Sequence, residues 1–442
     1  MALTPEESDL IEKHKRLLQK YSSKDELLLR YYKGRQRVEQ LGMAIPPAMR
    51  RFLVIANWCR TLVDTKDARQ QVRSLILPGE ETADPHLRAI WDASNLSAHT
   101  SMFNVDRMVY GRAFMSVGAN AKDSSLPWVR VESPREMSAS VDVLHERVTD
   151  AARLYGVDDE HSEPSLATLY LPNETIWAKR EGGSWVEVDR DQHDLGSVPV
   201  VMHLNRRMSG EWKGESEMSG LIPIVDSVAR SLTNLQFAQE AHGVPRMFMT
   251  GVSRGDFIDA DGKPIPQFEA YFDAIHMLTK ENAKVGQLDA ADLKNFETSL
   301  RIYGTQASTI TGFPARYWGI TSTNPPTEGA IHADEANLTR GVEADNEQLG
   351  MTLGWVGALA MRFATGDWVD GNRVRVDWFD PATPTVSQRE DALSKRRASG
   401  VLSREGYWDE LGWSEARKAK ERAYLAAEAV EYITEKDPAL DG

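Results

Sequence analysis

The sequence has very little cysteine: Cys59 is the only one in 442 residues. A single thiol excludes an internal disulfide framework and any metal site built from clustered cysteines, and it favours a reducing, cytosolic setting. No apolar run approaches the 20 or so residues that a membrane span needs, because Arg362 and several glycines interrupt the best stretch, 351–363. The acidic segment 1–9 lacks the basic-then-apolar pattern of a secretory signal, so none is expected.

Positive charge is also scarce. The chain has 52 Lys and Arg against 66 Asp and Glu, a net charge of −14. Surfaces that grip nucleic acid neutralise its phosphates and are usually basic, so this balance argues against a nucleic-acid clamp. A protein that lets nucleic acid slide past without gripping it is compatible with the same balance.

Motifs for catalysis are missing as well. The sequence has no phosphate-binding P-loop, no Gly-x-Ser-x-Gly elbow and no His-Glu-x-x-His helix. His332 and Glu335 have an i, i+3 spacing that could hold a metal, but their polar surroundings favour a solvated helix face. Cys59 could act as a nucleophile with His86 or His99, yet a lone cysteine beside a tryptophan is more typical of a core.

The pattern of the chain up to residue 216 predicts helices followed by sheet. Capping patterns at Thr4–Glu7 and at Ser23–Glu26 predict two helix starts, and two more helices are expected over 47–72 and 86–108. Residues 113–204 instead show short alternating runs between turn residues, which is typical of an antiparallel meander. The fold class is therefore predicted to be α+β.

Two later segments have a heptad pattern that favours long helices packed at a shallow angle. The apolar positions of the first, 217–245, are Leu221, Val225, Val228, Leu232 and Leu235. Those of the second, 289–312, include Leu293, Phe296, Leu300 and Tyr303 and continue to Ala307 and Ile310. They bracket residues 246–288, where two strands and a short helix over 266–280 are expected. This order predicts a stalk with a small α/β tip.

The tip is rich in acidic residues. The spacing of Asp256, Asp259 and Asp261 resembles a calcium loop, but the twelfth position is Gln267 rather than glutamate, so a turn at Asp261-Gly262 is favoured. Beyond the second heptad helix, residues 312–326 contain three prolines and two glycines and cannot be helical throughout. A long helix over 327–364, a strand over 373–379 and short C-terminal helices follow.

Short local motifs accompany this layout in the same order. They are Tyr31–Gly34, Asn57–Arg60, Val63–Thr65, Ser219–Asp226, Ala238–Glu240, Pro245-Arg246, Asn324–Ile331 with Glu335, Trp378–Pro381, Gln388–Leu393, Gly400–Ser403, Trp408 and Leu411-Gly412. Together with the stalk and tip, they resemble the siphophage-type portal proteins of tailed bacteriophages, from about residue 31 to 412. Residues 317–322, with Trp318-Gly319, depart from that pattern.

The resemblance implies a portal fold that forms rings. Its parts would be a wing of helices and sheet (1–216 and 327–381), a stem of two helices (217–245 and 289–312), a clip (246–288), a tunnel loop (313–326) and a helical crown (382–442). It implies a ring, typically of twelve copies, at one capsid vertex of the virion, assembled in the host cytoplasm. Double-stranded DNA would pass through its axial tunnel without sequence preference during packaging and ejection.

The resemblance also implies the partners. They would be the major capsid protein, the scaffolding protein, the large terminase subunit during packaging and then the head–tail adaptor, with no membrane, metal, cofactor or catalytic step. Candidate tunnel residues are Arg316, Thr321, Ser322, Thr323 and Asn324 of the loop and Lys294 and Arg301 of the second stem helix. Lys294 and Arg301 could equally pair with acidic neighbours across a subunit interface. Candidate docking residues of the clip are Asp256, Asp259, Asp261, Glu269 and Asp273, unless these form a solvated face.

Two alternatives stay open at this point. The chain could be another non-enzymatic protein of head assembly or completion that forms no DNA tunnel. A coat subunit, however, should be mostly β with one long spine helix, which the paired heptad helices do not suit. The chain could also be an enzyme such as a nuclease, but that would need convergent carboxylates or a nucleophile beside a base, and no spacing in the sequence supplies them.

Overall fold

The computed structural model describes residues 3–36, 54–157, 163–243, 247–251, 284–287, 293–321, 328–382, 386–413 and 415–436. The chain divides into two compact units, which are described separately. The first contains residues 1–326 and 335–381, and the second contains residues 327–334 and 382–442.

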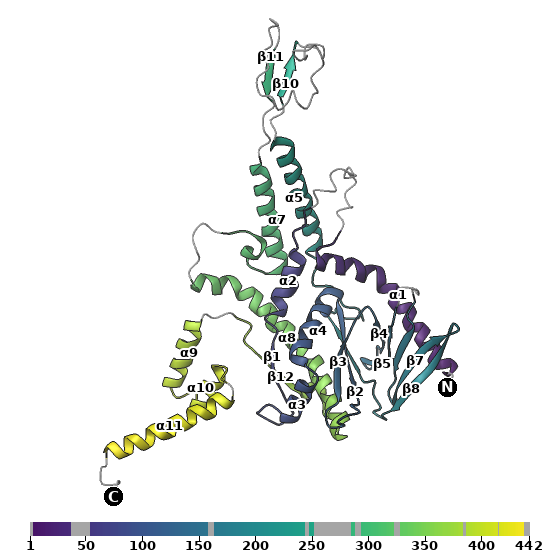
Figure 1. Ribbon diagram of the computed structural model, residues 1–442, viewed down its shortest axis with the longest axis vertical. Helices are drawn as coiled ribbons and strands as arrows, with labels where there is room; N and C mark the ends of the chain where they lie inside the picture. The colour runs from purple at the N-terminus through teal and green to yellow at the C-terminus, as the bar shows by residue number, and fades with distance from the viewer. Residues whose placement is uncertain are drawn as a thin grey trace, which may run out of the picture. The chain divides into compact units, whose positions relative to one another are not determined.

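The first unit begins with one long helix, α1 (Pro5–Lys33) (Figure 1). Its start is the predicted capping box, in which the Thr4 backbone N–H donates to the Glu7 carboxylate at 2.8 Å. Gly34, with φ 64°, ends it. The second helix start predicted at Ser23 is wrong, because α1 runs straight through and Asp25 is buried in an ion pair with Arg112 at 2.6 Å instead of capping.

The next helices are shorter than the sequence predicts. Helix α2 (Trp58–Asp67) ends early because Val72 already begins strand β1 (Val72–Ile76), so the helix predicted over 47–72 is wrong at its C-terminal end. The same prediction is also wrong at its start, because residues 54–57 are not helical and Asn57 caps α2. The helix predicted over 86–108 is two helices, α3 (Pro85–Ala93) and α4 (Leu96–Tyr110). Asn95 separates them with φ 50°, a conformation that asparagine tolerates and helices do not contain.

The β region forms two antiparallel sheets. Five strands in sequence order make the predicted meander: β4 (Met137–Asp142), β5 (Arg147–Tyr155), β6 (Leu166–Tyr170), β7 (Glu174–Glu181) and β8 (Ser184–Gln192). The others form a separate sheet of order β3-β2-β9, with β2 (Arg112–Gly118), β3 (Trp128–Glu132) and β9 (Val200–Leu204). The single meander predicted over 113–204 is therefore two sheets. In the three-stranded sheet the central strand β2 is buried along almost its whole length.

The predicted stalk is present as α5 (Ile222–Gly243) and α7 (Lys294–Thr311), which pack side by side (Figure 1). Strand β10 (Met247–Thr250) follows α5 and pairs antiparallel with β11 (Lys284–Gln287), which precedes α7. The helix predicted over 266–280 lies outside the described residues. After α7 come a 3-10 turn, η3 (Ala315–Trp318), and the long helix α8 (Glu328–Thr365). A second 3-10 turn, η4 (Gly371–Arg373), leads to strand β12 (Arg375–Trp378), which pairs with β1.

The second unit is helical, as expected. In addition to the first residues of α8, it contains α9 (Val386–Ala398), α10 (Arg404–Glu410) and α11 (Glu415–Lys436). Trp408 and Trp413 stack with ring centroids 5.7 Å apart, and Glu405 on α10 holds Arg422 on α11 at 2.6 Å.

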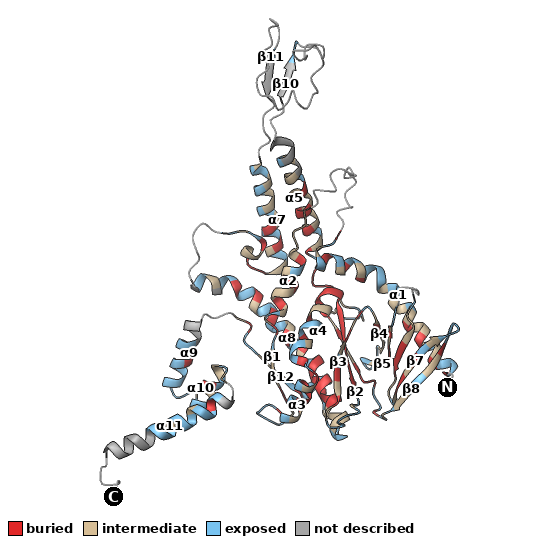
Figure 2. Ribbon diagram, in the orientation of Figure 1, coloured by how far each residue is buried: buried red, intermediate tan, exposed pale blue. Residues whose placement is uncertain are grey.

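The core of the first unit lies in several clusters (Figure 2). One joins α1, α2 and α4 to the lower ends of α5 and α7, and a second packs α3 and α4 with β2 and the C-terminal half of α8. A third places Ile11 of α1 against Leu154, Leu169 and Ile176 of the five-stranded sheet. The described helices include none with the length and apolar character required to cross a bilayer.

Candidate functional site

The stem has a buried base and a half-exposed upper part (Figure 2). We call stem base the residues Leu221, Val225, Val228, Gly304 and Ala307, which are all buried. We call upper stem the residues Leu232, Leu235, Leu293, Phe296, Leu300 and Tyr303, which are all of intermediate burial. Within the chain the heptad seam is therefore covered more completely at its base than above it, although Ile310, the last apolar position of the pattern, is exposed. Incompletely covered apolar side chains at spaced helical positions are suited to a contact with another helix.

Two further apolar side chains on α7 are open to solvent. Ile302 and Ile310 are 56% and 50% exposed. Ile302 lies outside the heptad positions, so the sequence argument about the seam missed it. An isolated exposed apolar residue is unremarkable, but these two belong to a helix whose inner face is also incompletely covered.

The first half of the predicted tunnel loop folds back onto the stem base. Phe313 and Trp318 are buried, with ring centroids 5.8 Å apart, and Trp318 also packs on Trp58 at 5.5 Å. Gly304 makes room for this return, since a Cβ there would come within 2.8 Å of the Ile320 side chain. The tunnel loop predicted over 313–326 therefore offers no exposed surface at Phe313 and Trp318, whose aromatic area is buried in the core.

Arg316 is held in a buried ion-pair cluster. Its guanidinium pairs with Glu335 of α8, and the same carboxylate accepts from Tyr317 Oη at 3.2 Å and from Arg69 at 3.2 Å. Arg69 also donates to the carbonyl of Pro381 at 3.1 Å. Glu335 thus ties the returning loop to the end of α2 and to α8. Arg316 reaches this carboxylate from the loop, so a role for it on DNA stays a prediction.

The other predicted tunnel residues are exposed where the structure describes them. Thr321 and Lys294 lie at the surface, and Arg301 is paired along its own helix with Glu297 at 3.4 Å. Exposed pairs of this kind contribute little, so Arg301 could exchange Glu297 for another partner. Ser322, Thr323 and Asn324 lie outside the described residues. So do the clip residues Asp256, Asp259, Asp261, Glu269 and Asp273.

A second buried polar network lies next to the stem base, and no local sequence pattern indicates it. Lys66 of α2 pairs with Glu217 at 2.7 Å and with Asp345 of α8 at 2.6 Å, and Arg206 reaches Glu217 at 2.8 Å. Burial alone would raise the pKa of Glu217, but the two cations outweigh it and lower the pKa to about 2. The network joins α2, α8 and the segment that leads into α5.

Arg107 extends this network from α4. The side chain is fully buried, donates to Asn205 at 2.8 Å and also bonds Gln70. Gln70 in turn donates to Asn346 of α8 at 3.0 Å. A buried cation is tolerated only when its donors are satisfied, so these amides hold the relative positions of α4, α8 and the strand end after β9.

The weak chemical signals of the sequence resolve in favour of structural roles. Cys59 is buried, and burial raises the pKa of its thiol to about 12, so no thiolate forms near neutral pH. Glu335, which has the spacing to bind a metal together with His332, instead forms ion pairs with Arg69 and Arg316. Within the described part of the chain, no group of three His, Cys, Asp or Glu side chains could hold a metal ion. The acidic calcium-like spacing at 256–261 lies outside it.

Comparison with known proteins assigns the class. Residues 8–435 match the family model described as "Phage portal protein, SPP1 Gp6-like". Two similar proteins named "Portal protein", from Mycobacterium phage D29 and Mycobacterium phage L5, are each 32% identical over 412 residues, which is 90% of this chain and 84% of theirs. A solved structure titled "Neck of native GTA particle computed with C12 symmetry" is similar with a TM-score of 0.44 and 13% identity, covering 88% of this chain and 92% of that one.

The family model and both relatives span most of the sequence. The chain therefore belongs to the phage portal protein family, in its SPP1 Gp6-like branch.

Proposed function

We propose that twelve copies of this chain form a ring at one vertex of a phage capsid, as a component of the virion assembled in the host cytoplasm. Membership in the portal family supports this role, and the stem carries the physical argument. The upper stem leaves six apolar side chains half-covered in the isolated chain. Neighbouring stems in a ring would cover them, because heptad seams bury their apolar positions against a second helix.

We propose further that the ring axis is a conduit for double-stranded DNA during packaging and ejection. The net charge of −14 supports sliding rather than gripping, since like charges repel and few phosphate contacts form. Thr321 and the following residues 322–324, together with Lys294 and Arg301 on α7, are the proposed DNA-facing positions. Each of these residues is polar or basic and can guide the backbone without reading its sequence.

The proposed partners follow from the same role. The ring would contact the major capsid and scaffolding proteins during head assembly, and its clip (246–288) would bind the large terminase subunit and then the head–tail adaptor. The acidic clip residues Asp256, Asp259, Asp261, Glu269 and Asp273 would meet basic partner surfaces. The chain itself would perform no catalytic step, and the terminase would supply the hydrolysis of ATP.

Packaging measurements with two variants test the conduit. Replacing Thr321 with Asp puts a negative charge at the proposed lumen and should slow DNA packaging without changing ring mass. Asn120→Asp introduces the same charge on the wing and serves as the control. Equal packaging by both variants would contradict a DNA-facing position for Thr321. Loss of the ring in the Thr321→Asp variant would show instead that this residue lies at a subunit contact.

A further inference from the structure

Strand β3 has one edge that no strand in the described part of the chain covers. In the described sheet its order is β3-β2-β9, so β3 pairs with β2 on one side and with no described strand on the other. An open edge of this kind presents free backbone donors and acceptors to any extended chain that approaches it.

The hydrogen-bond alternation identifies the groups on this edge. The Val129 backbone N–H donates to Ser94 Oγ at 3.1 Å, so it points away from β2. On the partner strand, the N–H of Val117, opposite Val129, donates to Pro199, towards β9. In an antiparallel pair such outward positions recur every second residue. Val129 is only 2% exposed, so the outward groups that an added chain can reach are the N–H and the carbonyl of Val131.

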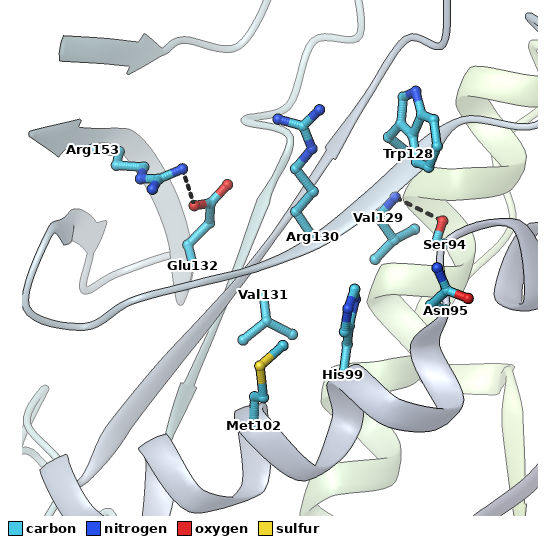
Figure 3. A pocket seen from close by; sticks show the side chains of 10 residues that line it. All are labelled: Ser94, Asn95, His99, Met102, Trp128, Val129, Arg130, Val131, Glu132 and Arg153. Carbon is cyan, nitrogen blue, oxygen red and sulfur yellow. Dashed lines mark hydrogen bonds and ion pairs between the residues drawn. The ribbon is translucent and has the colours of Figure 1, made fainter. Parts of the chain in front are cut away.

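A groove of about 310 Å³ runs along this edge (Figure 3). All five residues of β3, 128–132, line it, although alternate residues of a strand point to opposite faces. A groove lined by both sets of side chains follows the edge of the strand rather than one face of the sheet. Ser94 lies at one end of it, and the ion pair of Glu132 with Arg153, 3.0 Å long, lies at the other.

The two sides of the groove differ in chemistry (Figure 3). Trp128 and Arg130 lie on one side of β3, and Arg130 is exposed with no ion pair to any described residue. Val131 lies on the other side, with Met102 and His99 of α4, and the Met102 side chain is 50% exposed. A strand added here would place one set of side chains beside a cation and the alternate set on an apolar floor.

We propose that the open edge of β3 is a docking site for an extended, acidic segment of a partner protein, which adds to the sheet as a fourth strand. The N–H and the carbonyl of Val131 supply the pairing, as in other cases of β-strand addition. Arg130 selects carboxylates on one face of the added strand, and Val131 and Met102 select apolar side chains on the other. This docking site does not depend on the proposed ring or DNA conduit. A failure of the peptide to bind would therefore not contradict either of them.

The test uses a labelled pentapeptide with the sequence Glu-Val-Glu-Val-Glu and the full chain in its assembled state. Fluorescence polarisation should report binding, and a Lys-Val-Lys-Val-Lys peptide should bind at least about tenfold more weakly, because it loses a charge-assisted contact. The variant Arg130→Glu should reverse this preference. Arg147→Glu, an exposed arginine outside the groove, should leave it unchanged.

Backbone methylation separates strand addition from a side-chain pocket. Opposite an antiparallel edge, the valine N–H groups of the peptide point to β3 and the glutamate N–H groups point away. N-methylation of both valines should therefore abolish binding, and N-methylation of the glutamates should spare it. Equal binding of the two methylated peptides would overturn the proposal.

Two further outcomes are decisive. Val131→Pro removes an edge N–H without removing a bond to β2, so it should weaken the peptide while the melting temperature shows that the fold is kept. If the peptide binds the unassembled chain but not the assembled one, a neighbouring copy covers the edge, and docking of a partner protein is wrong. Failure of the Glu-Val-Glu-Val-Glu peptide to bind either form would also overturn it.

Discussion

The base and the upper part of the stem belong to the same two helices but are stabilised differently. At the base, Val225 and Ala307 are fully buried against α1, α2, α4 and the returning loop. In the upper stem, Leu232 and Leu300 are only half-covered. The same heptad pattern thus closes a core within one chain at one end and leaves an incomplete seam at the other. The base maintains the fold of the subunit, and the upper stem is available for contacts between subunits.

The largest effect is expected from a charge at the stem base. Val225→Asp would bury a carboxylate without a partner in an apolar cluster, which should lower the free energy of unfolding by about 4 kcal/mol or more. Chemical denaturation of the unassembled chain measures it. A decrease in the free energy of unfolding of less than about 1 kcal/mol would mean that the stem base is not a closed core.

Removal of the carboxylate that anchors the loop should have the next largest effect. Glu335→Ala leaves Arg69 and Arg316 without their shared partner, and breaking a buried pair in this way costs about 3 kcal/mol. Glu335→Gln is the control, because it keeps hydrogen-bonding capacity and should cost less. If both variants unfold at the same denaturant concentration as the wild type, the loop is not held by Glu335.

A charge in the upper stem should affect assembly more than folding. Leu232→Asp should lower the free energy of unfolding of the single chain less than Val225→Asp does, because Leu232 is incompletely buried. It should still abolish the ring, since neighbouring stems would bury the new carboxylate. Light scattering and denaturation of the same variant distinguish the two effects. A variant that assembles normally would show that the seam lies elsewhere.

The smallest effect concerns pH at the stem base. Burial raises the pKa of Asp226, which accepts a hydrogen bond from Tyr31 Oη at 2.8 Å. The pKa of this carboxyl is higher in the folded protein than its unfolded value of 3.8. The folded protein therefore loses stability as the pH rises above that value and the carboxyl ionises. Asp226→Asn should therefore become more stable relative to the wild type above about pH 4, by less than about 1 kcal/mol. The difference in melting temperature between pH 4 and pH 7 measures it.

The sequence predicted the parts of the fold that depend on local patterns. The Thr4 capping box, the heptads from Leu221 and Leu293 and the alternation of β4 to β8 are all short-range signals, and the structure contains each of them. The early end of α2 was missed because β1 pairs with β12 some 300 residues away, and tertiary pairing overrides helix propensity. The break at Asn95 was also missed, since only its positive φ shows it.

The candidate site was less predictable because its decisive contacts are long-range. Nothing near Arg316 in the sequence indicates that Glu335 and Arg69 surround it. Trp318 was predicted to lie in the tunnel loop, yet it packs on Trp58. Deleting residues 317–324 would therefore remove core area as well as the proposed lumen segment. Substitutions at Thr321 and in 322–324 are the cleaner test of the loop.

The accessibility of a cysteine placed at Ile302 tests most directly whether the stem is buried between copies. The native Cys59 is buried and has a raised pKa, so it gives almost no background with a maleimide. The Ile302→Cys variant should react fast in the 49.5-kDa chain and at least tenfold more slowly in an assembled ring of about 594 kDa, the mass of twelve copies. Lys122→Cys on the wing should react equally in both. Equal reactivity at position 302 in the single chain and the ring would contradict burial of the stem between copies.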